Sequence, residues 1–384
     1  MIKRIIFLGG EDVSARIAIS KNLVNLGYEV EIVGSEDGEI FAENNIKYRK
    51  LELNRELNFV DDFTTLRILR GILYSVKNET IVHAFDTKLT IFLPLASVGL
   101  KKIKVIRTIN GMGRIFTGCT VKNRILILIY KIVQKVIKNR VDFTIFQNTD
   151  NYNYFLDNGL VNPDTSVVIK SSGIDLDKYS SPISELTRRD LGIKYLKHHG
   201  QPTFILVSRL IKQKGVQNFL EAAKIAYDNG NKFNFLLIGQ LDSNKDSLSI
   251  EFIKKYRKYV KYLGKRKDIR ELLSLSDVFV LPTFYSEGVP RVLLEASAMS
   301  LALITTNMPG CNDVLIDQIN GLIVAPNDTK DLYGKMVSIT KDPEGLVRMK
   351  QKSLEHVTNF SLTKVTFECN KVYSIIGRKG HENL

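Results

Sequence analysis

The sequence predicts an α/β protein that contains two doubly wound domains, each with a parallel sheet covered by helices. The chain has 384 residues, which exceeds the ~250–300 residues at which a single hydrophobic core usually stops growing. Short apolar runs of strand length alternate with segments that have the apolar spacing of helices, as in successive strand–helix–strand units. This alternation stops near residue 175 and begins again near residue 204.

The first run of elements predicts the sheet of an N-terminal domain. A helical pattern over residues 14–26 ends at Gly27, a residue type that often caps helix C-termini. Strands joined by helices form parallel sheets, because a crossover is needed to bring the next strand back in the same direction. The expected strands are Ile5–Leu8, Val30–Val33, Ile81–Phe85, Val105–Ile109 and Phe143–Phe146.

The second run predicts the sheet of a C-terminal domain. The expected strands are Phe204–Val207, Phe235–Ile238, Val278–Leu281 and Ala302–Thr305, and the expected helices include Val216–Tyr227 and Val292–Met299. In such folds ligands bind beyond the carboxyl ends of the strands, so we expect the site there, where the two domains face each other.

The segment between the two runs, from Asp175 to Gln201, is rich in Ser, Lys, Arg and His and has no sustained apolar period. We expect a linker here, with a short helix near Leu186. The predicted organisation is an N-terminal domain at residues 1–180, a linker at 181–201, a C-terminal domain at 202–360 and a C-terminal helix at 361–384 that crosses back to the first domain.

Composition limits the possible partners and location. The formal net charge of +14 favours an anionic partner, which could be a nucleotide, a nucleic acid or an acidic membrane surface. The three cysteines are far apart and no His or Cys cluster has metal-ligand spacing. The N-terminal apolar run is too short for a signal peptide, and no apolar segment approaches the ~18 residues of a spanning helix. We therefore expect a cytoplasmic protein, soluble or attached to a membrane surface.

One candidate site follows the first strand of the second domain. That strand delivers Arg209 to its carboxyl end, and a short loop with Lys214 and Gly215 leads into a helix. Exposed N–H groups and the dipole at a helix start attract a diphosphate, and the two cations add full charges. A solvated basic loop would have the same appearance, so this segment alone leaves both interpretations open.

The second candidate site is the stretch from Ser286 to Ala296, which places Glu287 in a loop and Glu295 on the following helix. Pro290 suits the first turn of that helix, and Gly288 lets the backbone come close to a ligand. Carboxylates accept hydrogen bonds from hydroxyls, as a sugar and a ribose offer. Taken alone, Glu295 is equally consistent with an ion pair on its own helix.

Two common nucleotide fingerprints are absent from the sequence. There is no Gly-x-x-x-x-Gly-Lys-[Ser/Thr] loop, and the segment that begins at Gly9 and Gly10 lacks the third glycine of Gly-x-Gly-x-x-Gly. An NAD oxidoreductase is therefore disfavoured. The chain also lacks a helix-turn-helix, zinc or aromatic RNA-binding motif.

In combination these motifs resemble the retaining glycosyltransferases of glycosyltransferase family 4. The resemblance covers most of the chain and implies the GT-B fold, with two Rossmann-like domains that face each other across a cleft. It rests on Arg209 with Lys214 and Gly215, on Glu287 with Glu295, and on the stretches Ser172–Tyr179, Leu237–Gln240, Tyr262–Gly264 and Asn320–Pro326.

The resemblance implies a role for each matching residue. Arg209 and Lys214 would hold the donor diphosphate and offset the charge of the departing nucleotide, so no metal or other cofactor is implied. Glu287 would bind the transferred sugar, with backbone N–H groups of Gly288, Val289, Pro290 and Arg291 nearby, and Glu295 would bind the ribose. The base would lie near Gly239, Gln240, Leu263, Gly264 and Lys265, and Gly10 would let the first domain approach the diphosphate. Transfer would occur on the front face with retention, a β-phosphate oxygen taking the acceptor's proton.

Two residues of the first domain are candidates for the acceptor side. Some members of this family have a histidine after the strand that matches Val105–Ile109, where this chain offers Asn110. His83 ends another predicted strand and could point toward the acceptor. A histidine after a strand is also often a structural residue.

A basic amphipathic segment spans residues 123–140 and includes Arg124, Lys131, Lys135 and Lys138. Such a segment can lie in an anionic bilayer interface, but a crossover helix that buries one face on the sheet would have the same pattern. We expect peripheral attachment to the inner face of the cell membrane.

The stretches Thr108–Gly113, Glu287–Glu295 and Thr305–Cys311 resemble bacterial enzymes that build capsule, O-antigen or other glycans on polyprenyl diphosphate. This resemblance implies a UDP-sugar donor, with an N-acetylhexosamine as the transferred sugar, and a lipid-linked or glycan acceptor. A non-hydrolysing UDP-sugar epimerase shares the two-domain shape and remains an alternative. A basic nucleic-acid-binding protein is the alternative of another class.

Overall fold

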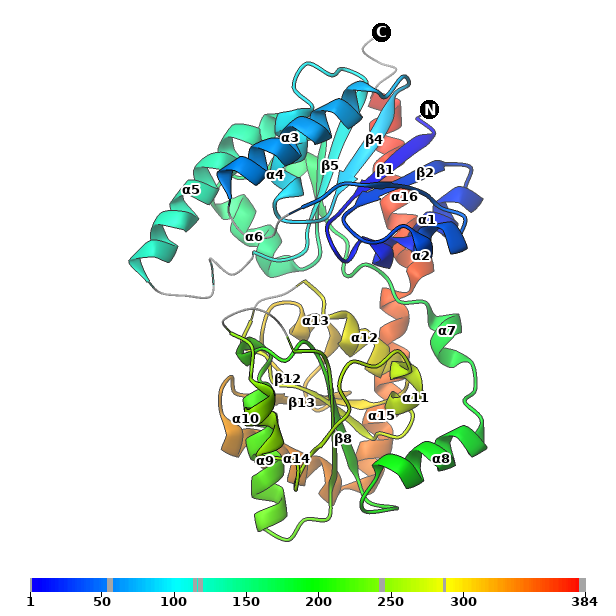
Figure 1. Cartoon of the computed structure of the whole chain (residues 1–384), viewed down its shortest axis with the longest axis vertical. Helices are drawn as coiled ribbons and strands as arrows, with labels where there is room; N and C mark the ends of the chain where they lie inside the picture. Colours follow the sequence, from blue (N-terminus) through cyan, green and yellow to red (C-terminus); the bar gives the residue numbers. More distant parts are fainter. Residues whose placement is uncertain are drawn as a thin grey trace. The chain divides into compact units, whose positions relative to one another are not determined.

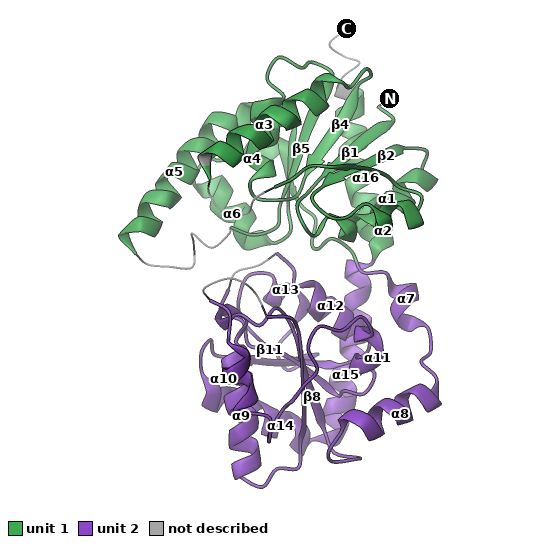
Figure 2. Cartoon of the chain, in the orientation of Figure 1, with its two compact units in different colours: residues 1–173, 362–384 green, residues 174–361 purple. Residues whose placement is uncertain are grey.

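The computed structural model describes residues 2–53, 58–112, 116, 120–241, 246–285 and 288–379. The chain forms two compact units (Figure 2). Unit 1 consists of residues 1–173 and 362–384, and unit 2 consists of residues 174–361. None of the helices in the described ranges has the length and apolar content needed to cross a membrane.

Unit 1 is built on a parallel sheet of seven strands in the order β3-β2-β1-β4-β5-β6-β7 (Figure 1). The order reverses direction at β1 and β4, so the sheet is doubly wound as predicted. Its strands are β1 (Arg4–Leu8), β2 (Glu29–Gly34), β3 (Lys47–Lys50), β4 (Thr80–Ala84), β5 (Ile103–Ile109), β6 (Phe143–Phe146) and β7 (Ser166–Val168).

Helices cover both faces of the unit 1 sheet. On one face the C-terminal helix packs beside the first helix, where Tyr28 donates to Asn370 Oδ1 at 2.8 Å. Tyr373 from the C-terminal helix lies in the same hydrophobic cluster as Phe7 of β1. The helices are α1 (Ile17–Asn25), α2 (Glu39–Glu43), α3 (Phe59–Tyr74), α4 (Leu89–Ala96), α5 (Val121–Ile137), α6 (Thr149–Asp157) and α16 (Leu362–Lys379).

Unit 2 is built on a second parallel sheet, of six strands in the order β10-β9-β8-β11-β12-β13 (Figure 1). Its central strand buries both faces, since Phe204 and Leu206 enter one hydrophobic cluster and Ile205 and Val207 enter the other. Its strands are β8 (Thr203–Val207), β9 (Asn234–Ile238), β10 (Lys261–Tyr262), β11 (Val278–Leu281), β12 (Ala302–Thr306) and β13 (Gly321–Val324).

The helices of unit 2 flank this sheet on its two faces. Helix α9 contributes Phe219 to one cluster and helix α12 contributes Leu293 to the other. The helices are α7 (Leu176–Ser180), α8 (Glu185–Tyr195), α9 (Val216–Asp228), α10 (Ile250–Lys254), α11 (Ile269–Leu273), α12 (Arg291–Ala298), α13 (Cys311–Val314), α14 (Thr329–Lys341) and α15 (Pro343–Val357).

The boundary between the units differs from the sequence-based one. The chain divides after Gly173, not at residue 180, because the N–H of Ile174 donates to the Phe360 carbonyl at 2.9 Å and its side chain is buried in the core of unit 2. Residues 181–201 are part of unit 2 and include α8, which covers most of the expected linker.

Candidate active site

The turn between β8 and α9 forms the centre of the candidate site, at the carboxyl edge of the unit 2 sheet. It contains Arg209 and a 3₁₀ turn over Lys212–Lys214, and it ends at Gly215 in the left-handed conformation, with φ of 70°. A Cβ at Gly215 would lie 2.1 Å from the Pro282 carbonyl oxygen. Only glycine therefore fits, and the turn packs directly on the loop that follows β11.

The two cations of this turn differ in burial. Arg209 is exposed, whereas Lys214 is only 8% exposed and immediately precedes the start of α9. Charges interact more strongly with a ligand anion when little water surrounds them. Beside Lys214, the N-terminus of this 13-residue helix supplies backbone N–H groups and the positive end of a dipole. The turn therefore has the components of a diphosphate-binding site.

A second loop holds the turn in place from β11. The hydroxyl of Thr283 donates to the Gln213 carbonyl at 2.9 Å, and the N–H of Phe284 donates to the same oxygen at 3.0 Å. The hydroxyl of Thr306 donates to the Thr283 carbonyl from the other side. The ends of β8, β11 and β12 are thus connected by hydrogen bonds.

The residues expected near the base lie on the next two strand ends. Gly239 has φ of 153°, and a Cβ there would lie 1.8 Å from the Ser208 carbonyl oxygen. Its N–H donates to the Gly264 carbonyl at 2.9 Å, and the hydroxyl of Tyr262 donates to the Gly239 carbonyl at 3.0 Å. Leu263 is half-buried, whereas Gln240 and Lys265 are exposed. The fold thus brings Gly239 and Gly264 together beside the β8–α9 turn.

The predicted sugar-binding loop is described only in part. Glu287 lies outside the described residues, so its assigned role stays a prediction. Gly288 is half-buried, and Val289 and Pro290 are buried where α12 begins. Pro290 has no N–H, so donors in this segment are limited to Gly288, Val289 and Arg291, which differs from the expectation.

Glu295 has two partners from different helices. Arg291 Nε donates to its Oε1 at 3.1 Å, which is the ion pair within one helix that the sequence left open. The second neighbour is Tyr179 of α7: burial and then the adjacent Glu295 carboxylate raise the pKa of the Tyr179 hydroxyl. The Glu295 side chain is 16% exposed. A carboxylate held in this way presents a preset acceptor to a ligand hydroxyl.

Tyr179 is a functional candidate that the sequence interpretation did not identify. It lies in the stretch Ser172–Tyr179 that carries part of the family resemblance, but no spacing rule links it to a residue more than 100 positions away. Its contact with Glu295 results from the packing of α7 on α12.

In unit 1, Gly10 and Asn110 lie at the carboxyl ends of β1 and β5. A Cβ at Gly10 would lie 3.1 Å from Asp86 Oδ2, so the backbone is closely packed there. Asn110 Nδ2 donates to the Phe85 carbonyl at 2.8 Å, and its Oδ1 is buried with no hydrogen-bond partner among the described residues. Asn110 Oδ1 is therefore a buried acceptor that no described residue uses.

His83 does not lie where an acceptor-side role would place it. It is 1% exposed, and its Nδ1 and Nε2 lie 2.8 Å from the Tyr373 hydroxyl and 2.7 Å from Thr108 Oγ1. Burial, and to a lesser degree the charge of Arg16, hold the pKa of His83 well below its usual value. Both ring nitrogens are used inside the core, so the expectation is corrected to a structural role.

This role predicts a pH-dependent stability. An unfolded histidine gains a proton below its pKa of about 6.5, whereas buried His83 stays neutral there, so stability is lost as the pH falls below that value. The loss approaches about 1.4 kcal/mol per pH unit. Urea unfolding at pH 7.0 and 5.5 should show a smaller loss in His83→Gln than in the wild type. An equal loss in both proteins would contradict the assignment.

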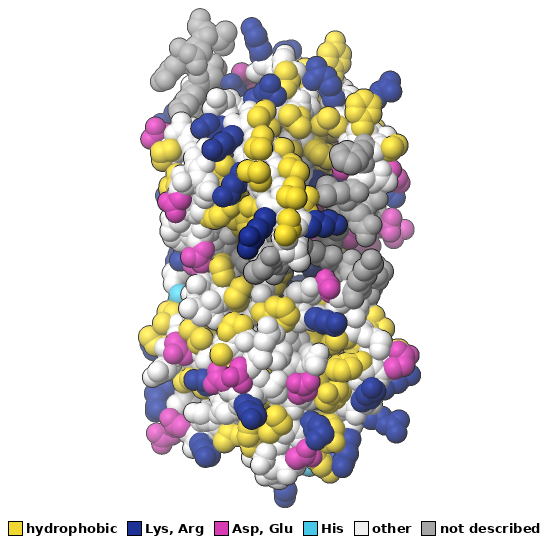
Figure 3. Space-filling model, turned by 90° about the vertical axis from the view of Figure 1, so that its left-hand side faces the viewer, with side chains coloured by type: hydrophobic (Ala, Val, Ile, Leu, Met, Phe, Trp, Pro, Cys, Tyr) yellow, Lys and Arg dark blue, Asp and Glu magenta, His cyan; other side chains and the backbone are white. Residues whose placement is uncertain are grey.

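Helix α5 has two different faces. The inner face is buried through Tyr130, Gln134 and Ile137, as expected of a crossover helix. Figure 3 looks onto the side of the molecule that carries α5 and shows apolar side chains with basic ones beside them. The exposed apolar residues of the opposite face, each at least half exposed, are Val121, Ile125, Leu128, Ile129, Ile132 and Val136.

The basic residues of this segment lie beside that apolar face. Lys131 Nζ donates to Asn158 Oδ1 at 2.7 Å and Lys138 Nζ to the Gly159 carbonyl at 3.3 Å, so both are anchored to the end of α6. Lys135 is exposed. In the described residues no group of three or more His, Cys, Asp or Glu side chains has an arrangement that could hold a metal ion.

Residues 188–356 match the family model for glycosyl transferases group 1. The chain is 29% identical over 327 residues to the N,N'-diacetylbacillosaminyl-diphospho-undecaprenol alpha-1,3-N-acetylgalactosaminyltransferase of Campylobacter jejuni, covering 85% of this chain and 84% of the relative. It is 25% identical to the UDP-Gal:alpha-D-GlcNAc-diphosphoundecaprenol alpha-1,3-galactosyltransferase of Escherichia coli, with coverage of 91% and 90%. The matched domain and these relatives identify the protein as a glycosyltransferase.

Solved structures agree with this fold along the whole chain. A glycosyltransferase from Rickettsia africae superposes with a TM-score of 0.78 at 19% identity and covers 98% of both chains. Anabaena HepE in complex with UDP superposes with a TM-score of 0.75 at 15% identity, covering 97% of this chain and 99% of the other. The predicted fold, two Rossmann-like α/β domains of the GT-B type, is confirmed.

Proposed function

We propose that this glycosyltransferase moves an N-acetylhexosamine from a UDP-sugar to a glycan acceptor on polyprenyl diphosphate, with retention, in the synthesis of a bacterial surface polysaccharide. The main supporting observation is the β8–α9 turn, where buried Lys214 is followed by Gly215, which is wedged against the Pro282 carbonyl. A cation that is fixed before the substrate arrives stabilises developing charge at little reorganisation cost.

In this proposal the donor lies along the carboxyl edge of the unit 2 sheet. Its diphosphate contacts Lys214, Arg209 and the first N–H groups of α9. Glu295, held by Tyr179 and Arg291, accepts from the ribose hydroxyls. The base lies against the backbone near Gly239 and Gly264, and Glu287 retains its predicted role toward the transferred sugar.

The reaction step needs no protein base in this scheme. The sugar–phosphate bond breaks as the acceptor hydroxyl attacks from the same face, and a β-phosphate oxygen of the leaving UDP takes the hydroxyl proton. Lys214 and Arg209 offset the negative charge that builds up on that phosphate. We propose that these two cations serve in place of a divalent ion.

The acceptor class follows from the named relatives. Both the C. jejuni and the E. coli enzymes carry undecaprenol diphosphate in the names of their acceptors, and a further relative, 24% identical, is the capsular polysaccharide biosynthesis glycosyltransferase CapM of Staphylococcus aureus. Asn110 Oδ1, which is buried and has no hydrogen-bond partner among the described residues, is the candidate acceptor atom in unit 1. The acceptor is thus proposed to be a sugar on a lipid diphosphate, bound by unit 1 through Gly10 and Asn110.

The proposal is tested with UDP-N-acetylglucosamine, UDP-N-acetylgalactosamine and UDP-galactose, each with and without a synthetic polyprenyl-diphosphate glycan. We expect UDP release only when the acceptor is present, an α-linkage by NMR, and unchanged turnover with EDTA. C2 epimerisation of the UDP-sugar without an acceptor and without net UDP release would favour the non-hydrolysing epimerase alternative instead. Inversion of the linkage would overturn the retaining mechanism.

The exposed apolar face of α5 supports attachment at the inner face of the cell membrane. Its six exposed apolar residues lie within ~100° of the helix circumference, and lysines on its edge suit anionic headgroups. Replacing Ile125, Leu128 and Ile132 together with Ser should weaken co-sedimentation with anionic vesicles at least tenfold, because each side chain gives up about 1.5–3 kcal/mol of burial.

A matched control tests whether the face itself matters. Val24, Ile68 and Val98 are exposed to a similar extent elsewhere in unit 1, and their replacement with Ser should leave vesicle binding within twofold. Equal loss in both triple variants would show that apolar exposure in general, not α5, causes the binding.

The contact between Tyr179 and Glu295 predicts a defect in donor binding. Tyr179→Phe keeps the buried ring but removes the hydroxyl beside the Glu295 carboxylate, and losing a polar neighbour of a charged group costs about 1.5–3 kcal/mol. We expect the KM for the UDP-sugar to rise about tenfold with kcat nearly unchanged, as for an interaction equal in ground and transition states. Tyr333→Phe, which removes a hydroxyl bonded to Asn231, is the control and should keep the wild-type KM.

A further inference from the structure

A cavity of about 280 Å³ opens at the amino-terminal edge of the unit 2 sheet. It lies where β9 begins, at Phe233 and Asn234, and beside the loop that leads into β8. The proposed donor site lies at the opposite, carboxyl edge of the same parallel strands, beyond Val207 and Ile238. The two locations are therefore separated by the length of the strands.

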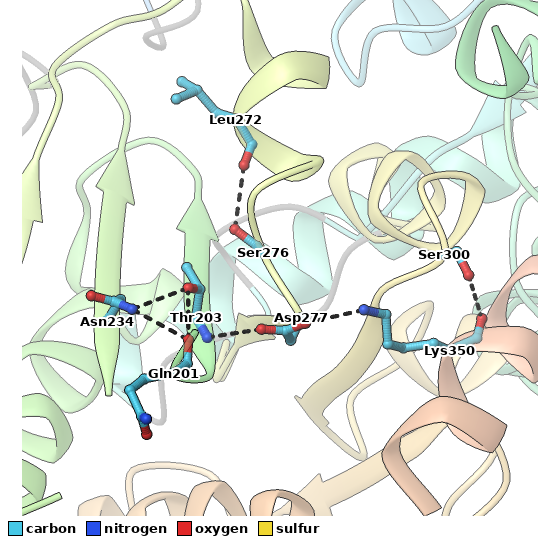
Figure 4. Close-up of polar contacts among 8 residues, drawn as sticks. All are labelled: Gln201, Thr203, Asn234, Leu272, Ser276, Asp277, Ser300 and Lys350. Carbon is cyan, nitrogen blue, oxygen red and sulfur yellow. Dashed lines mark hydrogen bonds and ion pairs between the residues drawn. The ribbon is translucent and has the colours of Figure 1, made fainter. Parts of the chain in front are cut away.

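Asn234, which lines this cavity, belongs to a polar network that continues through Thr203 to Asp277 and Lys350 (Figure 4). Asn234 Oδ1 accepts from the backbone N–H groups of Lys197 and His198, at 3.0 and 2.9 Å, and its Nδ2 donates to the His198 carbonyl at 2.8 Å. The N–H of Thr203 donates to Asp277 Oδ2 at 3.0 Å. Asp277 also forms an ion pair with Lys350, whose Nζ lies 3.1 Å from Oδ1. The loop that carries Lys197 is thus fixed to the sheet.

The lining of the cavity is basic and aromatic. It contains no Asp or Glu, although all of its residues are described. The basic members are Lys194, Lys197, His198, Arg257, Lys258 and Lys261, and the aromatic members are Tyr195, Tyr227, Phe233, Phe235 and Tyr259. We refer to this site as the basic cavity.

Two ammonium groups of the basic cavity meet at one aromatic ring. Lys258 Nζ lies 4.4 Å and Lys197 Nζ 5.6 Å from the centre of the Tyr227 ring, which contacts Tyr259 edge-on at 5.2 Å. Each cation gains from contact with the ring. The neighbouring Asp228 pairs with Lys224. An anion bound near both lysines would be attracted by the two charges.

We propose that the basic cavity binds a phosphate group, with the aromatic walls covering the organic part of the ligand. Its volume is just below the ~300–1,000 Å³ of typical small-molecule sites, so it suits a phosphomonoester or a phospholipid headgroup better than a whole nucleotide sugar. Lysines contact phosphate oxygens through charge-assisted hydrogen bonds. This site goes beyond the proposed transfer reaction and does not depend on it.

The test uses the full chain and two charge-matched double variants. Lys197→Gln with Lys258→Gln alters the basic cavity. Lys330→Gln with Lys341→Gln removes two exposed lysines of α14 in the same unit. Calorimetry with inorganic phosphate measures a soluble phosphate source, and co-sedimentation with vesicles of phosphatidylcholine and phosphatidylglycerol measures a lipid source.

We expect the basic-cavity variant to bind at least tenfold more weakly in one of the two arms, while the α14 variant stays within twofold of the wild type. Loss in the phosphate arm assigns a soluble ligand, and loss in the vesicle arm assigns a headgroup. Equal losses in the two variants would show a general effect of charge, and no loss in either arm would mean that the cavity binds no phosphate. Both results would overturn the proposal. Neither result would affect acceptor-dependent UDP release, which tests the transfer reaction separately.

Discussion

Replacing Lys214 with alanine is expected to lower kcat for sugar transfer by about 10²- to 10³-fold. Lys214 is only 8% exposed and lies just before the start of α9. Charge on the leaving diphosphate is greatest in the transition state, so the loss should appear mainly in kcat and less in KM. Steady-state measurement of UDP release at several donor concentrations separates the two parameters.

Lys212 provides the matched control for this experiment. It belongs to the same 3₁₀ turn and carries the same charge, but its side chain is exposed. Lys212→Ala should keep kcat within about threefold of the wild type, because an exposed charge is screened by solvent. If both variants lost activity to the same extent, the net charge of the turn, and not the position of Lys214, would be responsible.

Gly215→Ala is expected to disturb the structure of the β8–α9 turn. The new Cβ would lie 2.1 Å from the Pro282 carbonyl oxygen, and the residue would keep a φ of 70°. Backbone atoms cannot move aside as a flexible side chain does, so the β8–α9 turn must shift and take Lys214 with it. We expect kcat to fall at least 100-fold, since small misplacements of catalytic groups have effects of this size, and the midpoint of urea unfolding to decrease.

Gly230→Ala is a control that has the backbone strain of Gly215→Ala but not its steric clash. Gly230 follows the other end of the same helix with φ of 77°, and a Cβ there would meet nothing within 4 Å. Gly230→Ala should therefore cost only the ~1–2 kcal/mol of a left-handed residue and leave kcat unchanged. Equal activity of the two variants would mean that contact with Pro282 does not position the turn.

The strands that were predicted from sequence are those with a neighbour on each side. All nine, among them Ile5–Leu8 and Phe204–Val207, are present within about two residues of the expected limits, since strands covered on both faces must be continuously apolar. The four strands that were not predicted are the edges of the two sheets, β3 and β7 in unit 1 and β10 and β13 in unit 2. Edge strands are short and bond on one side only; β3 (Lys47–Lys50) and β10 (Lys261–Tyr262) carry exposed lysines, so their pattern resembles that of loops.

Part of the candidate site could be predicted because parallel strands end at one edge. Arg209 and Gly239 follow neighbouring strands, so their proximity required only the order of the elements. The contact between Tyr179 and Glu295 could not be predicted, because it depends on how α7 packs on α12. The burial of His83 also depended on the return of α16, which brings Tyr373 onto the unit 1 sheet.

The sequence by itself therefore determined the α/β class, the two sheets and the residues at the strand ends, because apolar period and strand–helix order are local properties of the chain. The tertiary structure alone decided which of those residues are buried, held or exposed. Lys214 is buried beside Gly215, which packs against the Pro282 carbonyl, and His83 is part of the core. Six lysine, arginine and histidine side chains line one cavity. These outcomes depend on packing between segments distant in sequence, which no local pattern encodes.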